Sequence, residues 1–382
     1  MAIALLAGCG TADQPTETVA EAQAPTTIHK KVVLSDAYHI DDRYMSMRGP
    51  WGQDEVKLLD TDEPELLWIT AYETHVVDLE GKRISQEWMC HANLDINPAE
   101  YQELFDTNLP VSGRLFTLSQ GQQRIEFPAG YGLPIINGQE LTLSTQVLNL
   151  NIDDPDMKVR HEVTIEFARD VELTTPMRPM FQGAVQGFKA LGDARYYGVK
   201  PEEEEEDHGP GCEVGAPAVE GDVDYDRFGQ EFSAHWQVLP GPEVNTTLVT
   251  EFLNLPYDTR VHYIAVHLHP YSESLRLLDR TTGETVYYAK VQDSENRVGL
   301  DHVEYFHSEE GIPIYKGHEY ELISKYNNTS QVPADSMAVM YLYMSEVNFS
   351  KPDPEKLAAV MTARREEQAN QPPEEGSDGP SM

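Results

Sequence analysis

The sequence has few basic residues, few cysteines and no long apolar segment. Its 382 residues include 28 Lys and Arg against 65 Asp and Glu, which gives a formal net charge of −37. Nucleic acids and anionic membrane surfaces are themselves negative, so a charge of this sign and size excludes them as partners. No apolar run approaches about 20 residues, the length that a membrane-spanning helix needs. The acidic excess therefore indicates solubility rather than binding to a polyanion.

Three cysteines are too few for a scaffold held together by many disulfides. The first, Cys9, ends the segment Leu-Ala-Gly-Cys, which resembles the lipobox of bacterial lipoproteins, where the cysteine is lipidated and becomes the mature N-terminus. A chance match in a soluble protein is the alternative. Residues 10–27 are polar and typical of a disordered tether, so we expect residues 1–28 to be a signal remnant and tether. The expected location is the bacterial cell envelope, in the periplasm or on the outer surface, with a lipid on Cys9 as the membrane anchor.

Most of the chain after the tether alternates apolar and polar residues between turn signals, which is the pattern of antiparallel strands. Its 25 Pro and 26 Gly agree with a β-rich protein that has many turns. Strands are expected, for example, over 232–239 (FSAHWQVL) and 245–255 (NTTLVTEFLNL). One short helix is expected at Pro98–Phe105, with Asn97 as its cap. The expected fold class is therefore all-β, with two antiparallel β-sandwich domains in tandem.

Changes in composition set the expected domain boundaries. We expect the N-terminal β-sandwich over residues 29–172 and the C-terminal β-sandwich over 173–352. Residues 201–221 contain a run of Glu and few large apolar side chains, so a solvated insertion is expected there, with loose collection of cations as the alternative. Residues 353–382 are expected to form a short helix, capped by Asp353, and then a disordered tail.

Two histidines and one methionine form the strongest candidate metal site. His267 and His269 lie in Val261–Pro270 (VHYIAVHLHP), a strand by composition, and residues i and i+2 of a strand share one face. Met337 lies at the start of a second apolar segment, DSMAVMYLYM. Two imidazoles and a thioether suit copper, especially Cu(I), better than Zn, Mg or Ca. Chance spacing of the histidines and a core role for the methionine are the alternatives.

The order of several motifs points to a family. These segments resemble the copper type II, ascorbate-dependent monooxygenases, which include peptidylglycine α-hydroxylating monooxygenase and dopamine β-monooxygenase. Within roughly residues 60–350, the matching segments are 127–135 (FPAGYGLPI), 146–151 (QVLNLN), 238–270, 315–328 (YKGHEYELISKYNN) and 335–344. The resemblance implies jelly-roll-like sandwiches, an oxygen-binding copper held by His267, His269 and Met337, and a reductant such as ascorbate.

The second copper of that family, which is thought to supply electrons, is held by an adjacent His-His pair and a distant His. In this sequence Cys90-His91 occupies the position of the His-His pair, and Leu148 occupies the position of the distant His. Met89, Cys90 and His91 could still bind Cu(I), although Met89 and His91 should face opposite to Cys90 on a strand. The alternative is a degenerate, metal-free site. We therefore expect one copper site, with Cys90 and His91 as candidate ligands of a second.

Substrate-anchoring positions also differ from the family. Peptidylglycine enzymes bind the substrate carboxylate with an Arg two residues before the HxH pair and an Asn two after the Met, and these positions are Ala265 and Val339 here. Loss of the Arg removes bidentate recognition of a carboxylate, so a glycine-extended peptide is not the expected substrate. The Tyr expected four residues after the Met is present as Tyr341, a candidate catalytic residue that could equally belong to the core.

Three functions agree with these patterns. The first is an exported copper-dependent monooxygenase-like protein, in which a single mononuclear copper activates O₂ for C–H hydroxylation of a small-molecule or peptide substrate. The second is a non-catalytic copper-binding lipoprotein for delivery, storage or sensing. The third is an interaction module with a vestigial metal site, since a fold does not by itself determine a function.

Overall fold

The computed structural model describes residues 26–61, 63–191, 224–225 and 230–370 of the chain. Several predictions fall outside the described residues: lipidation of Cys9, most of the tether, the acidic insertion 201–221 and the tail after residue 370. None of the helices in the described ranges is long and apolar enough to cross a membrane.

Two antiparallel sheets form the N-terminal half. The first has the strand order β1 (His29–Leu34), β10 (Met157–Arg169), β4 (Leu66–Val77) and β8 (Tyr131–Ile136), with β2 (Tyr38–Ile40) beside β10 and β7 (Arg124–Glu126) beside β4. The second has the order β3 (Trp51–Glu55), β9 (Leu141–Val147), β5 (Met89–Ile96) and β6 (Arg114–Ser119). The short helical segments of this half are η1 (Gln86–Trp88), α1 (Pro98–Phe105) and η2 (Asp170–Glu172).

The C-terminal half has two larger sheets and two small ones. One larger sheet has the order β11 (Arg178–Gln186), β24 (Ala338–Ser345), β17 (Thr259–Leu268) and β21 (Phe306–Ile314). The other has the order β16 (Gly241–Leu248), β22 (Tyr320–Asn328), β18 (Ser272–Asp279), β19 (Glu284–Asp293) and β20 (Leu300–Val303). One small sheet has the order β12 (Lys189–Ala190), β14 (Glu231–Ser233) and β13 (Asp224–Tyr225). The other pairs β15 (Trp236–Val238) with β23 (Ala334–Ser336). The helices are α2 (Thr250–Leu253) and α3 (Pro354–Asn370).

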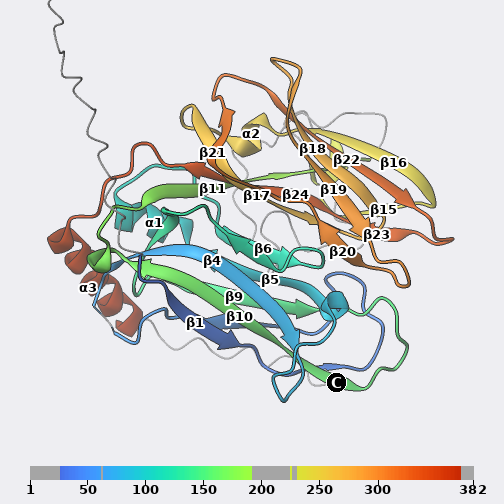
Figure 1. Cartoon of the computed structure of the whole chain (residues 1–382), viewed down its shortest axis with the longest axis horizontal. Coiled ribbons are helices and arrows are strands. Elements are labelled where there is room, and N and C mark those ends of the chain that lie inside the picture. The colour runs from blue at the N-terminus through green and yellow to red at the C-terminus, as the bar shows by residue number, and fades with distance from the viewer. Residues whose placement is uncertain (1–25, 62, 192–223, 226–229, 371–382) are drawn as a thin grey trace, which may run out of the picture.

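The two halves share one sheet and part of one hydrophobic core. β8 and β11 pair in parallel, which joins the first sheet of each half into a single sheet of ten strands. The core of the N-terminal half continues onto β17 and β24 through Tyr263 and Tyr343, and the Tyr343 hydroxyl donates to the backbone oxygen of Leu115 on β6 at 2.9 Å. Figure 1 shows β5 and β6 between the two halves. One face of β17 and β24 is therefore packed against the N-terminal half.

The structure confirms the all-β class and two local predictions. Strands in several packed sheets make up most of the described residues. α1 has the predicted bounds, and the Asn97 side chain accepts hydrogen bonds from two backbone N–H groups of its first turn. Asp353 accepts in the same way from two N–H groups at the start of α3. The jelly-roll connectivity and the domain boundaries stay predictions.

The continuous strand predicted over 232–239 is wrong. A bend at Ala234 and His235 separates β14 from β15. The Ser233 hydroxyl donates a hydrogen bond to the backbone oxygen of His235 inside this bend. Short hydroxyl side chains favour such local bonds in place of a regular ladder, which explains the interruption.

The strand predicted over 245–255 is also wrong in its second part. β16 ends at Leu248, and the single helical turn α2 follows it. The turn ends at Asn254, which adopts the left-handed conformation with φ of 36°. Asn tolerates this conformation better than most residues, so the chain can turn here and lead into β17.

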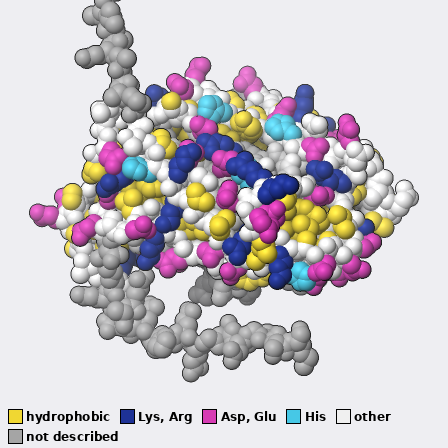
Figure 2. Space-filling view, turned by 60° about the horizontal axis from the view of Figure 1, so that its bottom comes forward, with side chains coloured by type: hydrophobic (Ala, Val, Ile, Leu, Met, Phe, Trp, Pro, Cys, Tyr) yellow, Lys and Arg dark blue, Asp and Glu magenta, His cyan; other side chains and the backbone are white. Residues whose placement is uncertain are grey.

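Surface charge is mixed rather than gathered by sign on the face drawn in Figure 2. Basic, acidic and hydrophobic side chains alternate across that face. Ion pairs of the first sheet show the same mixing: the Arg124 guanidinium on β7 lies 2.7 Å from a Glu73 oxygen on β4 and 3.3 Å from a Glu166 oxygen on β10, the strand beyond β4. The acidic excess of the sequence therefore does not form one continuous patch on this face.

Candidate metal centre

Two histidines at the end of β17 lie beside the start of β24. His267 is the ladder partner of Val339, and ladder partners have their side chains on the same face. Met337 lies two residues before Val339, and both belong to the core that faces the N-terminal half. His269 follows the last residue of β17, and it lines the same cavity as His267. The pairing therefore places the three predicted copper ligands at one end of one sheet face.

Each imidazole of this pair has an oxygen close to its Nδ1 atom. His267 Nδ1 lies 3.0 Å from Ser119 Oγ at the end of β6. His269 Nδ1 lies 3.3 Å from Asp335 Oδ2, and its Nε2 has a longer contact of 3.4 Å with Ser46 Oγ. The two ring centroids are 5.2 Å apart, at an interplanar angle of 89°. An oxygen at one ring nitrogen fixes the orientation of the ring and directs the other nitrogen toward a ligand.

Burial keeps at least two histidines of this region neutral. It lowers the pKa of His267 well below the ordinary value, and positive charge on His269 or His91 would lower it further. Burial likewise lowers the pKa of His91 to about 3, with Arg114 as the next cause. A metal binds the unprotonated nitrogen of an imidazole, so His267 would not have to lose a proton at neutral pH before binding one.

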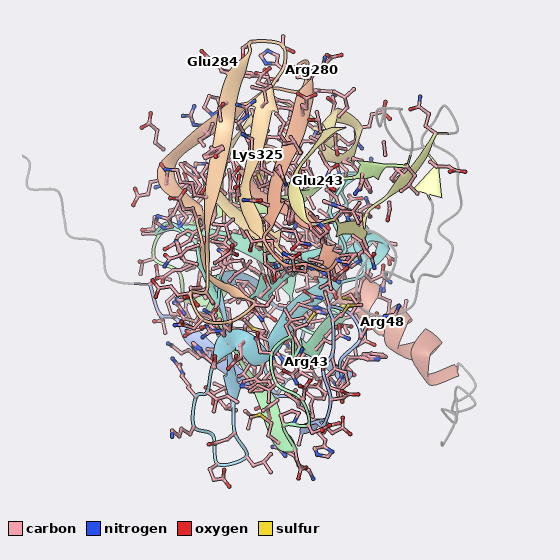
Figure 3. The ribbon with its side chains drawn as sticks, turned by 90° about the vertical axis from the view of Figure 1, so that its right-hand side faces the viewer. Arg43, Arg48, Glu243, Arg280, Glu284 and Lys325 are labelled. Carbon is pink, nitrogen blue, oxygen red and sulfur yellow. The ribbon has the colours of Figure 1, made fainter. Side chains whose placement is uncertain are left out.

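His267 and His269 line a cavity of about 320 Å³ between the two halves, whereas Met337 is buried in the core behind them and is not part of the cavity wall. Most of the wall is apolar, and its apolar side chains include Met45, Met89, Leu148, Leu268, Leu300 and Val332. Arg43 also lines the cavity, but its guanidinium pairs with Asp153 at 2.8 Å. Figure 3 shows Arg43 below the middle of the molecule and Arg280 at its upper end. Apolar walls with few polar groups fit a small, mainly apolar ligand.

The residues of the predicted second copper site lie on the N-terminal side of the same region. The ladder of β5 has a bulge between Met89 and His91, and Cys90 is its extra residue. A bulge interrupts strand alternation, and Met89 and Cys90 both line the cavity, whereas His91 is not part of its wall. The expectation that Met89 and Cys90 face opposite sides is therefore wrong. Cys90 Sγ lies 3.7 Å from Ser46 Oγ, the hydroxyl that also contacts His269.

Four further predicted positions are apolar or lie in the core. Leu148 lines the cavity and offers no donor to a metal. Ala265 and Val339, at the positions of the family's carboxylate anchors, are buried in the core. Tyr341 is buried there as well, and its hydroxyl accepts a hydrogen bond from Thr117 Oγ1 at 3.0 Å. Tyr341 is not part of the cavity wall, and its catalytic role stays a prediction.

His235 joins His269 and Asp335 in a group that the sequence patterns do not reveal. One potential ligand atom from each of these side chains lies within 4.8 Å of the other two. His235 stands in the bend before β15, and β15 pairs with β23, where Gln237 is the partner of Asp335. No spacing motif connects His235 to the HxH pair. Only the bend and this two-stranded pairing bring it to the site.

The electrostatics of this group favour a positive ligand. Burial lowers the pKa of His235 to about 4, although Asp335 opposes the shift. Burial alone would raise the pKa of the Asp335 carboxyl, but its contact with His269 and the charges of His269 and His235 lower it below the usual value. At neutral pH the group therefore presents a carboxylate beside the uncharged imidazole of His235.

No family model and no curated protein matches the chain. Among solved structures it is similar to PNGF-II in two crystal forms, at 8% identity, with TM-scores of 0.29 and 0.28 over 82% of this chain. The chain spans 65% and 66% of those PNGF-II chains, less than two thirds of each. It is also similar to the VP2 subviral particle of infectious bursal disease virus, at 10% identity and a TM-score of 0.17, over 88% of this chain and 76% of that chain. TM-scores this low carry no argument about function.

Proposed function

We propose that this protein binds one copper ion through His267, His269 and Met337 and acts as a monooxygenase-like enzyme. One observation carries the proposal. Two imidazoles at the end of β17 line an apolar cavity, each with its Nδ1 close to a side-chain oxygen, on the face that Met337 shares. The resemblance to the copper type II monooxygenases supports the same three ligands.

The donor set fits copper. Neutral imidazole and thioether are ligands of copper, whereas Mg²⁺ and Ca²⁺ prefer oxygen. Ser119 would orient His267 so that Nε2 is its ligand atom, because a ring nitrogen that donates to an oxygen leaves the other nitrogen with the lone pair. The Asp335 carboxylate, 3.3 Å from His269 Nδ1, would favour the ring proton on Nδ1 by its charge and so leave Nε2 as the ligand atom there too. Ser46 would have to turn away from His269 Nε2. Their contact of 3.4 Å is long for a hydrogen bond, so breaking it would lose little free energy.

The cavity suggests what the protein contributes to the reaction. A copper ion at this position would supply O₂ binding and reduction, the chemistry that C–H hydroxylation needs. The chain itself would orient the two histidines, exclude bulk water with apolar walls and hold a substrate beside them. Ala265 and Val339 offer no charged anchor, so we expect a small, mainly apolar substrate rather than a carboxylate. Electrons would come from an external reductant such as ascorbate.

Non-catalytic copper binding for delivery, storage or sensing is the second candidate. It is favoured by the N-terminal side of the region, where Leu148 offers no ligand atom and His91 lies outside the cavity wall. That arrangement does not match the electron-transfer copper of the family, which a standard two-copper mechanism needs. For both candidates, lipidation of Cys9 and a location in the cell envelope stay predictions.

Oxygen uptake separates the two candidates. The full chain is loaded with one equivalent of copper and given ascorbate and a panel of small apolar compounds. We expect oxygen consumption that depends on one class of compound and is lost in His267→Ala. His302→Ala, which removes an exposed histidine of β20, is the matched control and should keep the activity. Tight copper binding without substrate-dependent uptake would favour the second candidate, and no copper binding would contradict both.

A further inference from the structure

We propose that His235, His269 and Asp335 form a second ligand set, which binds one borderline divalent cation such as Zn²⁺ through Nδ1 of His269. Their donors are two imidazole nitrogens and a carboxylate oxygen, drawn from three separate segments of the C-terminal half. Zn²⁺ and Fe²⁺ take this combination, whereas the soft set with Met337 suits Cu(I). The two sets therefore differ in the metals they select.

The distances are close to those of a coordinated ion. His269 Nδ1 and Asp335 Oδ2 are already 3.3 Å apart, and two donors on a tetrahedral Zn²⁺ are separated by about 3.4 Å. The ring centroids of His235 and His269 are 5.5 Å apart, and all three potential ligand atoms lie within 4.8 Å of one another. A side-chain rotation of His235 that closes at most about 1.4 Å would complete three ligands and leave one position open.

Unsatisfied polar atoms support a missing ligand at this place. Both ring nitrogens of His235 are buried and have no hydrogen-bond partner among the described residues. The same holds for Asp335 Oδ2, whose contact with His269 is short but not aligned as a hydrogen bond. Buried polar atoms without partners are costly and rare, so their presence on two neighbouring side chains calls for an explanation. One divalent cation would coordinate Asp335 Oδ2 and one ring nitrogen of His235, because the two nitrogens of a ring point in different directions.

The backbone holds two of the ligands in place before any metal binds. β15 and β23 form a two-stranded sheet in which Gln237 is the partner of Asp335. The Ser233 hydroxyl closes the bend that carries His235. A preformed set of ligands loses little conformational freedom on binding, which favours a specific site over adventitious surface binding.

Sharing of His269 links this site to copper, and this step rests on the proposed function. A neutral imidazole has one lone pair, so a cation at Nδ1 moves the ring proton to Nε2. Nε2 is the atom that the copper set needs. Zn²⁺ at the second set and copper at the first should therefore exclude one another, and the divalent cation would control copper loading.

Zn²⁺ titration of the metal-free full chain by calorimetry at pH 7 tests the site itself. We expect one Zn²⁺ per chain, with affinity reduced at least tenfold in His235→Ala, His235→Gln and Asp335→Asn. Met337→Ile should leave Zn²⁺ affinity unchanged, and so should His302→Ala. Circular dichroism establishes that each variant is folded. Absence of stoichiometric Zn²⁺ binding would overturn the proposal, as would equal binding by wild type and the His235 variants, which would indicate adventitious binding to acidic segments only.

Cu(I) titration in the presence of Zn²⁺ tests the shared ligand. Zn²⁺ should reduce Cu(I) affinity at least tenfold in the wild type and have no effect in His235→Ala. Unchanged Cu(I) affinity in Zn²⁺-loaded wild type would overturn the exclusion. If Zn²⁺ binds as expected but Cu(I) does not bind at all, the proposed function fails and the divalent site stands. If Cu(I) binds and Zn²⁺ does not, only the divalent site fails.

Discussion

The two sides of the cavity carry similar residue types but hold them differently. On the C-terminal side, β17 has its own register shift between Val261 and Tyr263, but its pairing with β24 is regular from Tyr263 to Leu268, and the His267 and His269 rings each have an oxygen at Nδ1. On the N-terminal side, the bulge at Cys90 breaks the alternation, and His91 is buried outside the cavity wall. The comparison teaches that ligand-type residues make a candidate site only where the strand register and the neighbouring oxygens aim them at one point.

The N-terminal side has the properties of a core instead. Met89 is fully buried and packs in a hydrophobic cluster with Trp88 and Val147. Leu148, directly after β9, closes this side of the cavity with an aliphatic surface. The predictions below test whether the N-terminal side serves stability and the C-terminal side serves metal binding.

Removal of Met89 should have the largest effect on stability. Met89→Ala leaves a cavity in a packed cluster, so the free energy of unfolding should fall by about 2–5 kcal/mol. Urea denaturation of the metal-free protein measures this change. Copper affinity of the folded variant should stay within about threefold of wild type, because a thioether on this side is not a ligand in our account. A large loss of copper affinity with little loss of stability would reverse the assignment of the two sides.

Removal of one histidine from each side of the cavity should change Cu(I) affinity by very different amounts, as measured in a competition titration. His267→Ala should weaken Cu(I) binding by at least about 100-fold, since it removes a ligand. His91→Ala should change Cu(I) affinity by less than about threefold. Equal effects of the two substitutions would mean that both sides bind copper.

Acid should destabilise the N-terminal half through its buried histidines. Burial lowers the folded-state pKa of His91 to about 3 and that of His161 to about 4, below the ordinary value of 6.5. The unfolded chain takes up these protons first, so the stabilisation is complete above about pH 6.5 and is lost as the pH falls toward about 4. Each histidine contributes about 1.4 kcal/mol per pH unit inside that window.

Replacement of His91 tests this pH dependence. His91→Gln should reduce the slope of unfolding free energy against pH by about 1.4 kcal/mol per unit between pH 4.5 and 6. Urea denaturation at several pH values, with EDTA present, provides the slope. His302→Ala should leave it unchanged, because that histidine is exposed in the folded chain. An unchanged slope in His91→Gln would show that His91 is accessible to protons in the folded state.

Ser119→Ala should have the smallest of these effects. The hydroxyl orients His267 without being a ligand, so we expect Cu(I) affinity to fall about tenfold. Ser119→Thr keeps the hydroxyl and should recover most of the affinity. Wild-type affinity in Ser119→Ala would mean that the contact with Nδ1 does not orient the ring.

Local sequence rules predicted the parts of the structure that depend on neighbours in the chain. Asn97 before Pro98 predicted α1 and its cap, because the capping bonds are made within one turn. Alternation predicted that His267 and His269 share a face, and the ladder then placed Met337 on that face. The oxygen at Nδ1 of His267 could not be predicted, since Ser119 comes from the other half of the chain.

The failures of prediction occur where the backbone leaves its regular period. Cys90 is one extra residue in a ladder, and a bulge has no reliable signature in residue type. His235 stands in a bend that divides an apparently continuous strand, so neither spacing nor alternation marks it as a possible ligand. Its proximity to Asp335 follows from the pairing of β15 with β23, two strands far apart in sequence.

Copper stoichiometry in two variants tests the central claim most directly. Cu(I) bound per chain is measured for the wild type, Met337→Ile and Cys90→Ala, each verified as folded by circular dichroism. Our account predicts one copper per chain in the wild type, strongly weakened binding in Met337→Ile and unchanged binding in Cys90→Ala. Two coppers per chain, or loss of copper in Cys90→Ala with retention in Met337→Ile, would contradict the assignment of the metal to the C-terminal side of the cavity.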